Sequence, residues 1–190
     1  MSRSNHRLQA GIPATKDGDI ECLRHLLVDI DPVRPSNTNS SDQEHASALK
    51  KADEIMDSLT KKGWPDPILM DTGNGSCLVY RLPDLPNDQV SRATVATFLK
   101  ALGCQFNSER IKVDSTVSNP SRLIRVPGTL NRKGDSTADR PQRRAAIISC
   151  PQTVGQVSLD QLHIFAFSFK EESASTPVSR DSGMQDRNHF

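Results

Sequence analysis

The sequence has few of the residues that mark secreted, membrane-spanning or metal-ribbon proteins. Its four cysteines are Cys22, Cys77, Cys104 and Cys150, and no two of them have the CxxC spacing of a zinc ribbon or a thioredoxin-type site. No apolar run reaches the roughly 20 residues that a membrane helix needs. The N-terminal segment also has no apolar signal core. We therefore expect reduced thiols, no membrane partner and a cytoplasmic location.

Aromatic residues are also scarce, and neither sign of charge prevails. Aromatics make up 4% of the chain, hydrophobic residues 35% and charged residues 25%. The formal net charge of +1 excludes a globally basic nucleic-acid coat protein but leaves room for a local basic site. The sequence shows no aromatic platform for base stacking, so strong binding of single strands by this chain alone is not expected.

The length of 190 residues suits one domain with tails. Residues 1–19 are polar and show no periodic pattern, which predicts a flexible N-terminal segment. Residues 170–190 are rich in serine and nearly free of aliphatic side chains, which is typical of a disordered tail. The predicted folded domain is therefore 20–169.

Apolar runs alternate with helical periodicities inside this domain. Ser41 and Glu44 have the spacing of a helix capping box, and a short hairpin is indicated by the Asn74-Gly75 pair between two apolar runs. The expected helices are 42–62 and 90–102, and the expected strands are 23–31, 67–71, 77–82, 110–114, 123–126 and 145–149.

This order of elements predicts an α+β fold, specifically the βαββαβ sheet of RRM and ferredoxin-like proteins with extra strands. In such a sheet the first strand lies between the third and the fourth and is antiparallel to both. The end of strand 23–31 would then meet the beginnings of its two neighbours. We therefore expect Asp29 and Asp31 to lie near Ser76, Cys77 and Asp114.

The two aspartates at the end of the first strand indicate a cation site. Asp29 and Asp31 should point to the same face of the sheet, roughly 7 Å apart. Carboxylates that close repel each other unless a cation or a proton intervenes. A DxD pair alone is more often only a polar strand end, but a third acid, Asp114, would complete a two-metal clamp for phosphoryl displacement.

A basic stretch follows the third acid. Between positions 120 and 144, seven basic residues stand against two acidic ones. A solvated basic loop would have the same composition, but the position directly after Asp114 favours a phosphate-bearing partner. The turn 73–75 is a second candidate phosphate contact, although a tight hairpin requires the same glycines. The basic residues are Arg122, Arg125, Arg132, Lys133, Arg140, Arg143 and Arg144.

Four segments occur in a telling order: LLVDIDP (26–32), DTGNGSCLVYRLPDLPND (71–88), IKVDSTVSNPSRLIRVPGTLNRKG (111–134) and RPQRRA (140–145). Together they resemble the archaeo-eukaryotic primase superfamily, and in particular the primase-polymerases of phages and plasmids. The resemblance covers about residues 18–150. It implies the C-terminal half of a primase-polymerase catalytic core.

The resemblance also implies roles for individual residues. Asp29, Asp31 and Asp114 would be the catalytic acids, holding two Mg²⁺ or Mn²⁺ ions that bind the incoming triphosphate and activate the primer 3′-hydroxyl. The implied partners are nucleotide triphosphates, template DNA and primer, with a replicative helicase as a further candidate. The implied nucleotide-binding residues are Gly75, Ser76, Cys77, Arg122 and Lys133, with Arg125 and Arg132 as further candidates.

Three departures from the family pattern support a second hypothesis. Cys77 stands where the family usually has histidine, and Gln142 stands at the histidine of an RPHR-like segment. The family also begins with another αβ unit, whereas here only residues 1–20 precede the acidic strand. The alternative is therefore a catalytically weakened nucleotide- or DNA-binding module for replication initiation or regulation. A two-metal nuclease would share the acids but lacks an obvious water-activating base.

Overall fold

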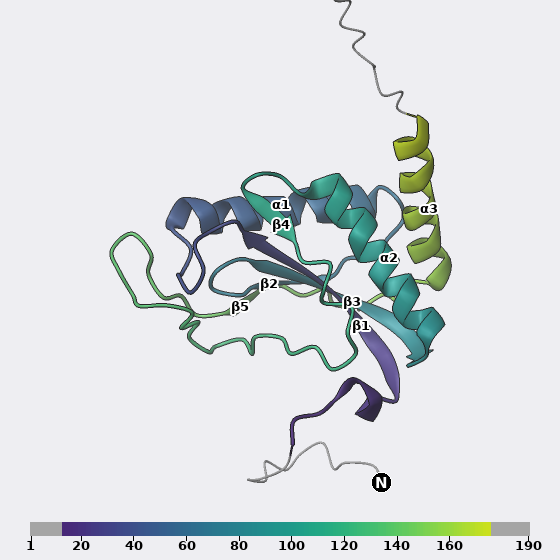
Figure 1. The fold of residues 1–190 in the computed structure, drawn as a ribbon, viewed down its shortest axis with the longest axis horizontal. Helices are drawn as coiled ribbons and strands as arrows, with labels where there is room; N and C mark the ends of the chain where they lie inside the picture. The colour runs from purple at the N-terminus through teal and green to yellow at the C-terminus, as the bar shows by residue number, and fades with distance from the viewer. Residues whose placement is uncertain (1–12, 176–190) are drawn as a thin grey trace, which may run out of the picture.

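An antiparallel sheet forms the centre of the computed structural model, which describes residues 13–175 (Figure 1). Its strands follow the order β4-β1-β3-β2-β5. The sheet and its helices confirm the expected α+β class. β1 lies between β3 and β4 and is antiparallel to both, as expected. The strands are β1 (Cys22–Pro32), β2 (Ile68–Asp71), β3 (Ser76–Pro86), β4 (Ile111–Val113) and β5 (Ala146–Ser149).

In the described part of the chain, three α-helices accompany the sheet: α1 (Asp42–Thr60), α2 (Gln89–Phe106) and α3 (Leu159–Ser175). α1 begins with the predicted capping box. The Glu44 backbone N–H donates to the Ser41 hydroxyl at 3.2 Å, and the Ser41 N–H donates to the Glu44 carboxylate at 2.8 Å. Each bond satisfies a donor that the first helical turn or its cap would otherwise leave unpaired, so the helix start is fixed.

Alternation along β1 separates a helix-covered face of the sheet from a second face. Leu26, Val28 and Ile30 are buried in the core under the helices, whereas Leu27, Asp29 and Asp31 face the other way. The long irregular segment 114–145 runs along this second face (Figure 1). The fold therefore keeps its apolar core on one side of the sheet and its acidic positions on the other.

Aromatic side chains join the helices to the sheet within the core. The Trp64 ring stacks on Phe98 at a centroid distance of 4.9 Å and meets Tyr80 edge-on at 5.2 Å. Phe165 of α3 lies 5.1 Å from Phe98, so α3 completes the core beside α2. Aromatic pairs at these distances add stability beyond the area that they bury.

Two expectations about the chain are changed by the structure. Residues 123–126 form no strand, because they pair with no neighbour and precede Pro127 and Gly128, whose φ is 86°. Helix α3 continues through Ser175, so part of the predicted tail 170–190 is helical. The rest of that tail and most of the predicted flexible segment 1–19 lie outside the described residues. Within 13–175, no helix has both the length and the hydrophobicity to cross a membrane.

Candidate functional site

Three acidic residues from two distant parts of the chain meet at one end of β1. Asp29 pairs with Cys77 across the β1–β3 ladder, and Asp31 lines the same cavity as Asp29. Asp114 directly follows β4, and its backbone N–H donates to the Asp29 carbonyl at 2.8 Å. The sheet topology thus produces the convergence that the sequence predicted.

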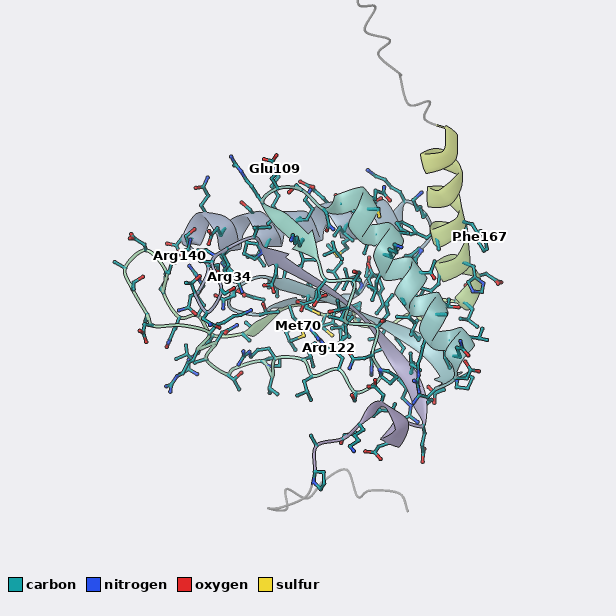
Figure 2. All side chains as sticks on the ribbon, viewed as in Figure 1. Arg34, Met70, Glu109, Arg122, Arg140 and Phe167 are labelled. Carbon is teal, nitrogen blue, oxygen red and sulfur yellow. The ribbon has the colours of Figure 1, made fainter. Side chains whose placement is uncertain are left out.

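The guanidinium of Arg122 lies between two of these acids. Its Nη2 is 3.2 Å from Asp114 Oδ2 and 3.9 Å from Asp29 Oδ2. The other oxygen of Asp114, Oδ1, accepts hydrogen bonds from the Thr116 backbone N–H at 2.8 Å and from its hydroxyl at 2.6 Å. Figure 2 shows Arg122 beside the second face of the sheet. Both Oδ2 atoms therefore face a single positive charge.

Burial and neighbouring negative charge both disfavour the ionised form of Asp29. Burial, reinforced by Asp31 and Asp114, raises the pKa of Asp29 to about 6, and Arg122 and Lys133 oppose this rise. A nearby cation stabilises an ionised carboxylate in this setting. The oxygen donors of the three acids are the ligands that Mg²⁺ and Mn²⁺ prefer.

The oxygen donors therefore suit hard divalent cations, although the three acids do not form a complete set of metal ligands. Within the described part of the chain, no group of three or more His, Cys, Asp or Glu side chains is arranged to hold a metal ion. Arg122 is one reason, because its guanidinium lies between Asp29 and Asp114, where a shared cation would bind.

A cavity of about 340 Å³ opens beside the acids, between the sheet and segment 114–145. Asp29, Asp31 and Cys77 form its sheet side. Arg122, Arg125 and Lys133 from the irregular segment also line it. A concave site of this size with opposed charges suits a small polyanion that arrives with a cation.

The basic stretch has two different roles in the structure. Arg122, Arg125 and Lys133 line the cavity, whereas Arg140 and Arg143 fasten the loop to the start of α1. Arg140 forms a two-pronged ion pair with Glu44 at 2.7 and 2.8 Å. Arg143 bonds to the Asp42 carboxylate and donates to the Ser40 carbonyl at 2.9 Å. Arg144 donates to the Gly128 carbonyl at 2.8 Å. The number of basic residues in the stretch therefore overstated how many of them face the cavity.

The glycine turn between β2 and β3 supports the acids from behind. A Cβ on Gly75 would lie 2.3 Å from the Ile30 carbonyl oxygen and 2.9 Å from Asp31 Oδ1. Only glycine allows the turn to pack this closely against the end of β1. Gly73 has φ of 85° and donates its N–H to Asp71 Oδ1 at 2.6 Å, as a tight hairpin requires. Gly75 therefore contributes to the site by lacking a side chain, which leaves room for the Asp31 carboxylate beside the turn.

Ser76 and Cys77 point to opposite faces of β3. The buried Ser76 hydroxyl donates to the Ala48 carbonyl of α1 at 2.9 Å. Ser76 was expected at the nucleotide site, but its side chain points away from the cavity. The reason is strand alternation, which sends only one of two adjacent side chains to each face. Cys77 does line the cavity, and burial beside Asp29 raises the pKa of its thiol, which therefore stays neutral.

The sequence reasoning gave no individual role to four polar residues that line the cavity: Arg34, Thr72, Asn74 and Asn131. Arg34 donates to Asp31 Oδ1 at 3.2 Å, and its side chain is only 6% exposed. Asn131 donates to the Thr72 carbonyl at 2.8 Å and accepts from Arg125 at 3.3 Å. Asn74, part of the candidate turn 73–75, accepts a hydrogen bond from the Ser40 N–H at 2.9 Å.

Two of these residues carried a sequence signal that could have been used. Arg34 stands three residues after Asp31, and Asn74 stands in the predicted turn. The buried side-chain NH₂ of Asn74 has no hydrogen-bond partner among residues 13–175. Gln142, at the position of a family histidine, donates to the Gly134 carbonyl at 2.7 Å and so braces the loop.

The candidate site is thus assembled from the end of β1, the β2–β3 turn and the segment that follows β4. Its chemistry combines crowded carboxylates with arginine and lysine side chains around one cavity. Comparison of the sequence with models of known protein families and with curated proteins finds no match, so the function is inferred from these residues.

Proposed function

We propose that this chain is a primase-polymerase-like nucleotidyltransferase domain. With Mg²⁺ or Mn²⁺, it would add nucleotides to a primer on a DNA template during replication, and a replicative helicase is a candidate partner. One observation carries the proposal: Asp29, Asp31 and Asp114 converge beside a cavity that Arg122 and Lys133 also reach. Acids that hold cations and bases that hold phosphates are the two requirements of phosphoryl-group transfer.

The sheet supports the same proposal. Four of its strands follow the order β4-β1-β3-β2, all antiparallel, which is the order of a split βαβ sheet. We therefore propose the RRM or ferredoxin-like topology for this core, with β5 as an added edge strand. In this arrangement the acids stand at the end of the central strand, on the face that the helices leave uncovered.

The chain's own residues would divide the work as follows. Carboxylate oxygens of Asp29, Asp31 and Asp114 would hold the cations. Bound Mg²⁺ or Mn²⁺ supplies positive charge that stabilises an in-line transfer at phosphorus. Arg122 and Lys133 would bind the triphosphate oxygens through charge-assisted hydrogen bonds, which fixes the orientation of the nucleotide.

Titration of Mn²⁺ with a nucleotide triphosphate tests the proposed site. We expect Asp31→Ala to weaken binding roughly tenfold or more, because the cation loses a carboxylate ligand. The exposed Glu109 on the loop before β4 offers a matched control, and Glu109→Ala should bind like wild type. Equal binding by wild type and Asp31→Ala would contradict the proposal.

A second candidate function is a nucleotide- or DNA-binding module with weakened catalysis. The observation that favours it is Cys77, a buried neutral thiol beside Asp29 that donates hydrogen bonds poorly. Primer extension by wild type and Cys77→His separates the two functions. Synthesis by wild type would remove the second candidate, whereas synthesis only by Cys77→His would support it. Metal-dependent DNA degradation without nucleotides would instead indicate a nuclease.

A further inference from the structure

We propose that Arg122 is an internal cation that holds Asp29 and Asp114 together and competes with a divalent metal ion for the same two carboxylates. The proposal rests on the metal site of the proposed function. It adds that Arg122 has two alternative partners, the carboxylates in the metal-free protein and a phosphate group in the loaded one.

The geometry of the acid pair is the first support. A single nitrogen, Arg122 Nη2, contacts Oδ2 of both Asp114 and Asp29, at 3.2 and 3.9 Å. Thr116 holds the other oxygen of Asp114, so the Oδ2 atoms of both acids share the same guanidinium nitrogen. A metal ion bridging them would occupy the space where the guanidinium now lies. The two cations therefore exclude each other.

The neighbouring bases do not have this arrangement. Arg34 is committed to Asp31 and to the backbone carbonyls of Pro32 and Thr38, and its side chain is almost fully buried. Lys133 opposes the rise in the pKa of Asp29, but no ion pair joins it to Asp114 in the described residues. Arg122 alone among the described bases contacts two of the three acids.

Arg122 is also placed to change partners. Its side chain is 35% exposed and belongs to the irregular segment 114–145, next to Leu123, which is 89% exposed. It lines the cavity as well as contacting the acids. A modest rotation of the side chain would therefore carry the guanidinium from the carboxylates to an anion in the cavity, without breaking a helix or strand.

This exchange predicts coupling between two ligands. A metal ion alone must displace Arg122 and leave the guanidinium without a partner, so it binds weakly. A polyphosphate gives the displaced guanidinium a new partner, and thereby favours metal binding. By thermodynamic linkage the metal favours polyphosphate binding by the same factor. Arg122 would therefore stay paired with the two carboxylates until a nucleotide binds.

Binding of Mn²⁺ alone, followed by electron paramagnetic resonance, tests the competition. We expect Arg122→Gln to bind Mn²⁺ roughly tenfold more tightly than wild type, because no internal cation has to be displaced. Arg110→Gln provides the matched control, since Arg110 is exposed and lies outside the cavity. In thermal melts, Arg122→Gln should unfold at a lower temperature than wild type without metal, and Mn²⁺ should raise its Tm more than that of wild type.

The outcomes separate this inference from the proposed function. Equal or weaker Mn²⁺ binding by Arg122→Gln would overturn the competition and leave the metal site intact. No Mn²⁺ binding by any variant would overturn both. Where Arg122→Gln is too unstable to titrate, Arg122→Lys keeps the charge but loses the planar guanidinium. It should bind Mn²⁺ no more weakly than wild type, and weaker binding would count against the inference.

Discussion

Asp29 shows how a single residue can join stability to function. Its side chain is held among Asp31, Asp114 and a buried thiol, where an ionised carboxylate is costly. Arg122 and Lys133 offset only part of this cost, because the pKa stays raised. A residue placed this way destabilises the metal-free fold at neutral pH and makes the site receptive to added positive charge.

The cost of Asp29 predicts a pH-dependent gain in stability for Asp29→Asn. The carboxyl of the unfolded chain ionises near pH 4, whereas burial and the neighbouring acids raise the folded pKa to about 6. The folded wild type therefore loses stability as the pH rises between these values. Between about pH 4.5 and about pH 7.5, Asp29→Asn should gain about 2 kcal/mol relative to wild type.

Urea denaturation at the two pH values measures this gain. Glu109→Gln, at an exposed position on the loop before β4, serves as the control and should follow the wild-type pH dependence. A constant difference between Asp29→Asn and wild type at both pH values would show that the carboxyl is not perturbed in the folded protein.

At the scale of elements, the hairpin β2–β3 sets the position of the acidic strand. The end of β1 is held on one side by β4 and on the other by β3, and the turn behind it packs against Ile30 and Asp31 through Gly75. The turn thus fixes the position of the acids, and its residues Thr72 and Asn74 also line the cavity. Gly75 is the glycine of this hairpin whose close approach bears directly on the acidic end of β1.

Gly75→Ala should therefore destabilise the protein by roughly 1–3 kcal/mol, as overpacking does in a close-packed core. The added Cβ would meet the Ile30 carbonyl oxygen at 2.3 Å, and this obstacle is backbone of β1, which cannot move aside cheaply. Gly18→Ala is the matched control, because a Cβ there meets nothing within 4 Å and should be tolerated. Thermal or urea unfolding measures both variants, and similar stability of the two would refute the tight packing.

Sequence patterns predicted the elements whose signals are local. The capping box at Ser41 and Glu44 located α1, and apolar runs located β1 and β3. Strand alternation placed Asp29 and Asp31 on one face, and the sheet order brought Asp114 to them. These features follow from short-range periodicity and from topology, which a sequence carries directly.

Other features depend on contacts that no local pattern reveals. Arg140 and Arg143 have the same composition signal as Arg122, but their partners Glu44 and Asp42 lie a hundred residues away on α1. Helix α3 was not predicted, although it begins inside the predicted domain and its buried Leu162 and Phe165 have helical spacing. The orientation of Ser76 toward α1 likewise depended on the register of β3.

At the scale of the whole molecule, the sheet separates stability from chemistry. The helices cover one face, where Trp64, Phe98 and Phe165 pack together. Segment 114–145 covers the other face, where the acids and the cavity lie. Substitutions on the two faces should therefore affect different measurements, even though both faces belong to the same strands.

A pair of variants tests this separation. Phe165→Ala should lower the free energy of unfolding by about 3 kcal/mol, because a buried aromatic ring leaves a cavity. Affinity for Mn²⁺ with a nucleotide triphosphate should remain that of wild type wherever the variant is folded.

Lys133→Ala should do the reverse. The Lys133 side chain supports no core packing but lines the cavity, so nucleotide affinity should fall roughly tenfold with little change in stability. Phe167→Ala, at a ring that is 62% exposed, controls for the loss of an aromatic side chain from α3. Weaker nucleotide binding by folded Phe165→Ala would show that the helix-covered face also shapes the site, because the strands would then transmit core packing to the acids.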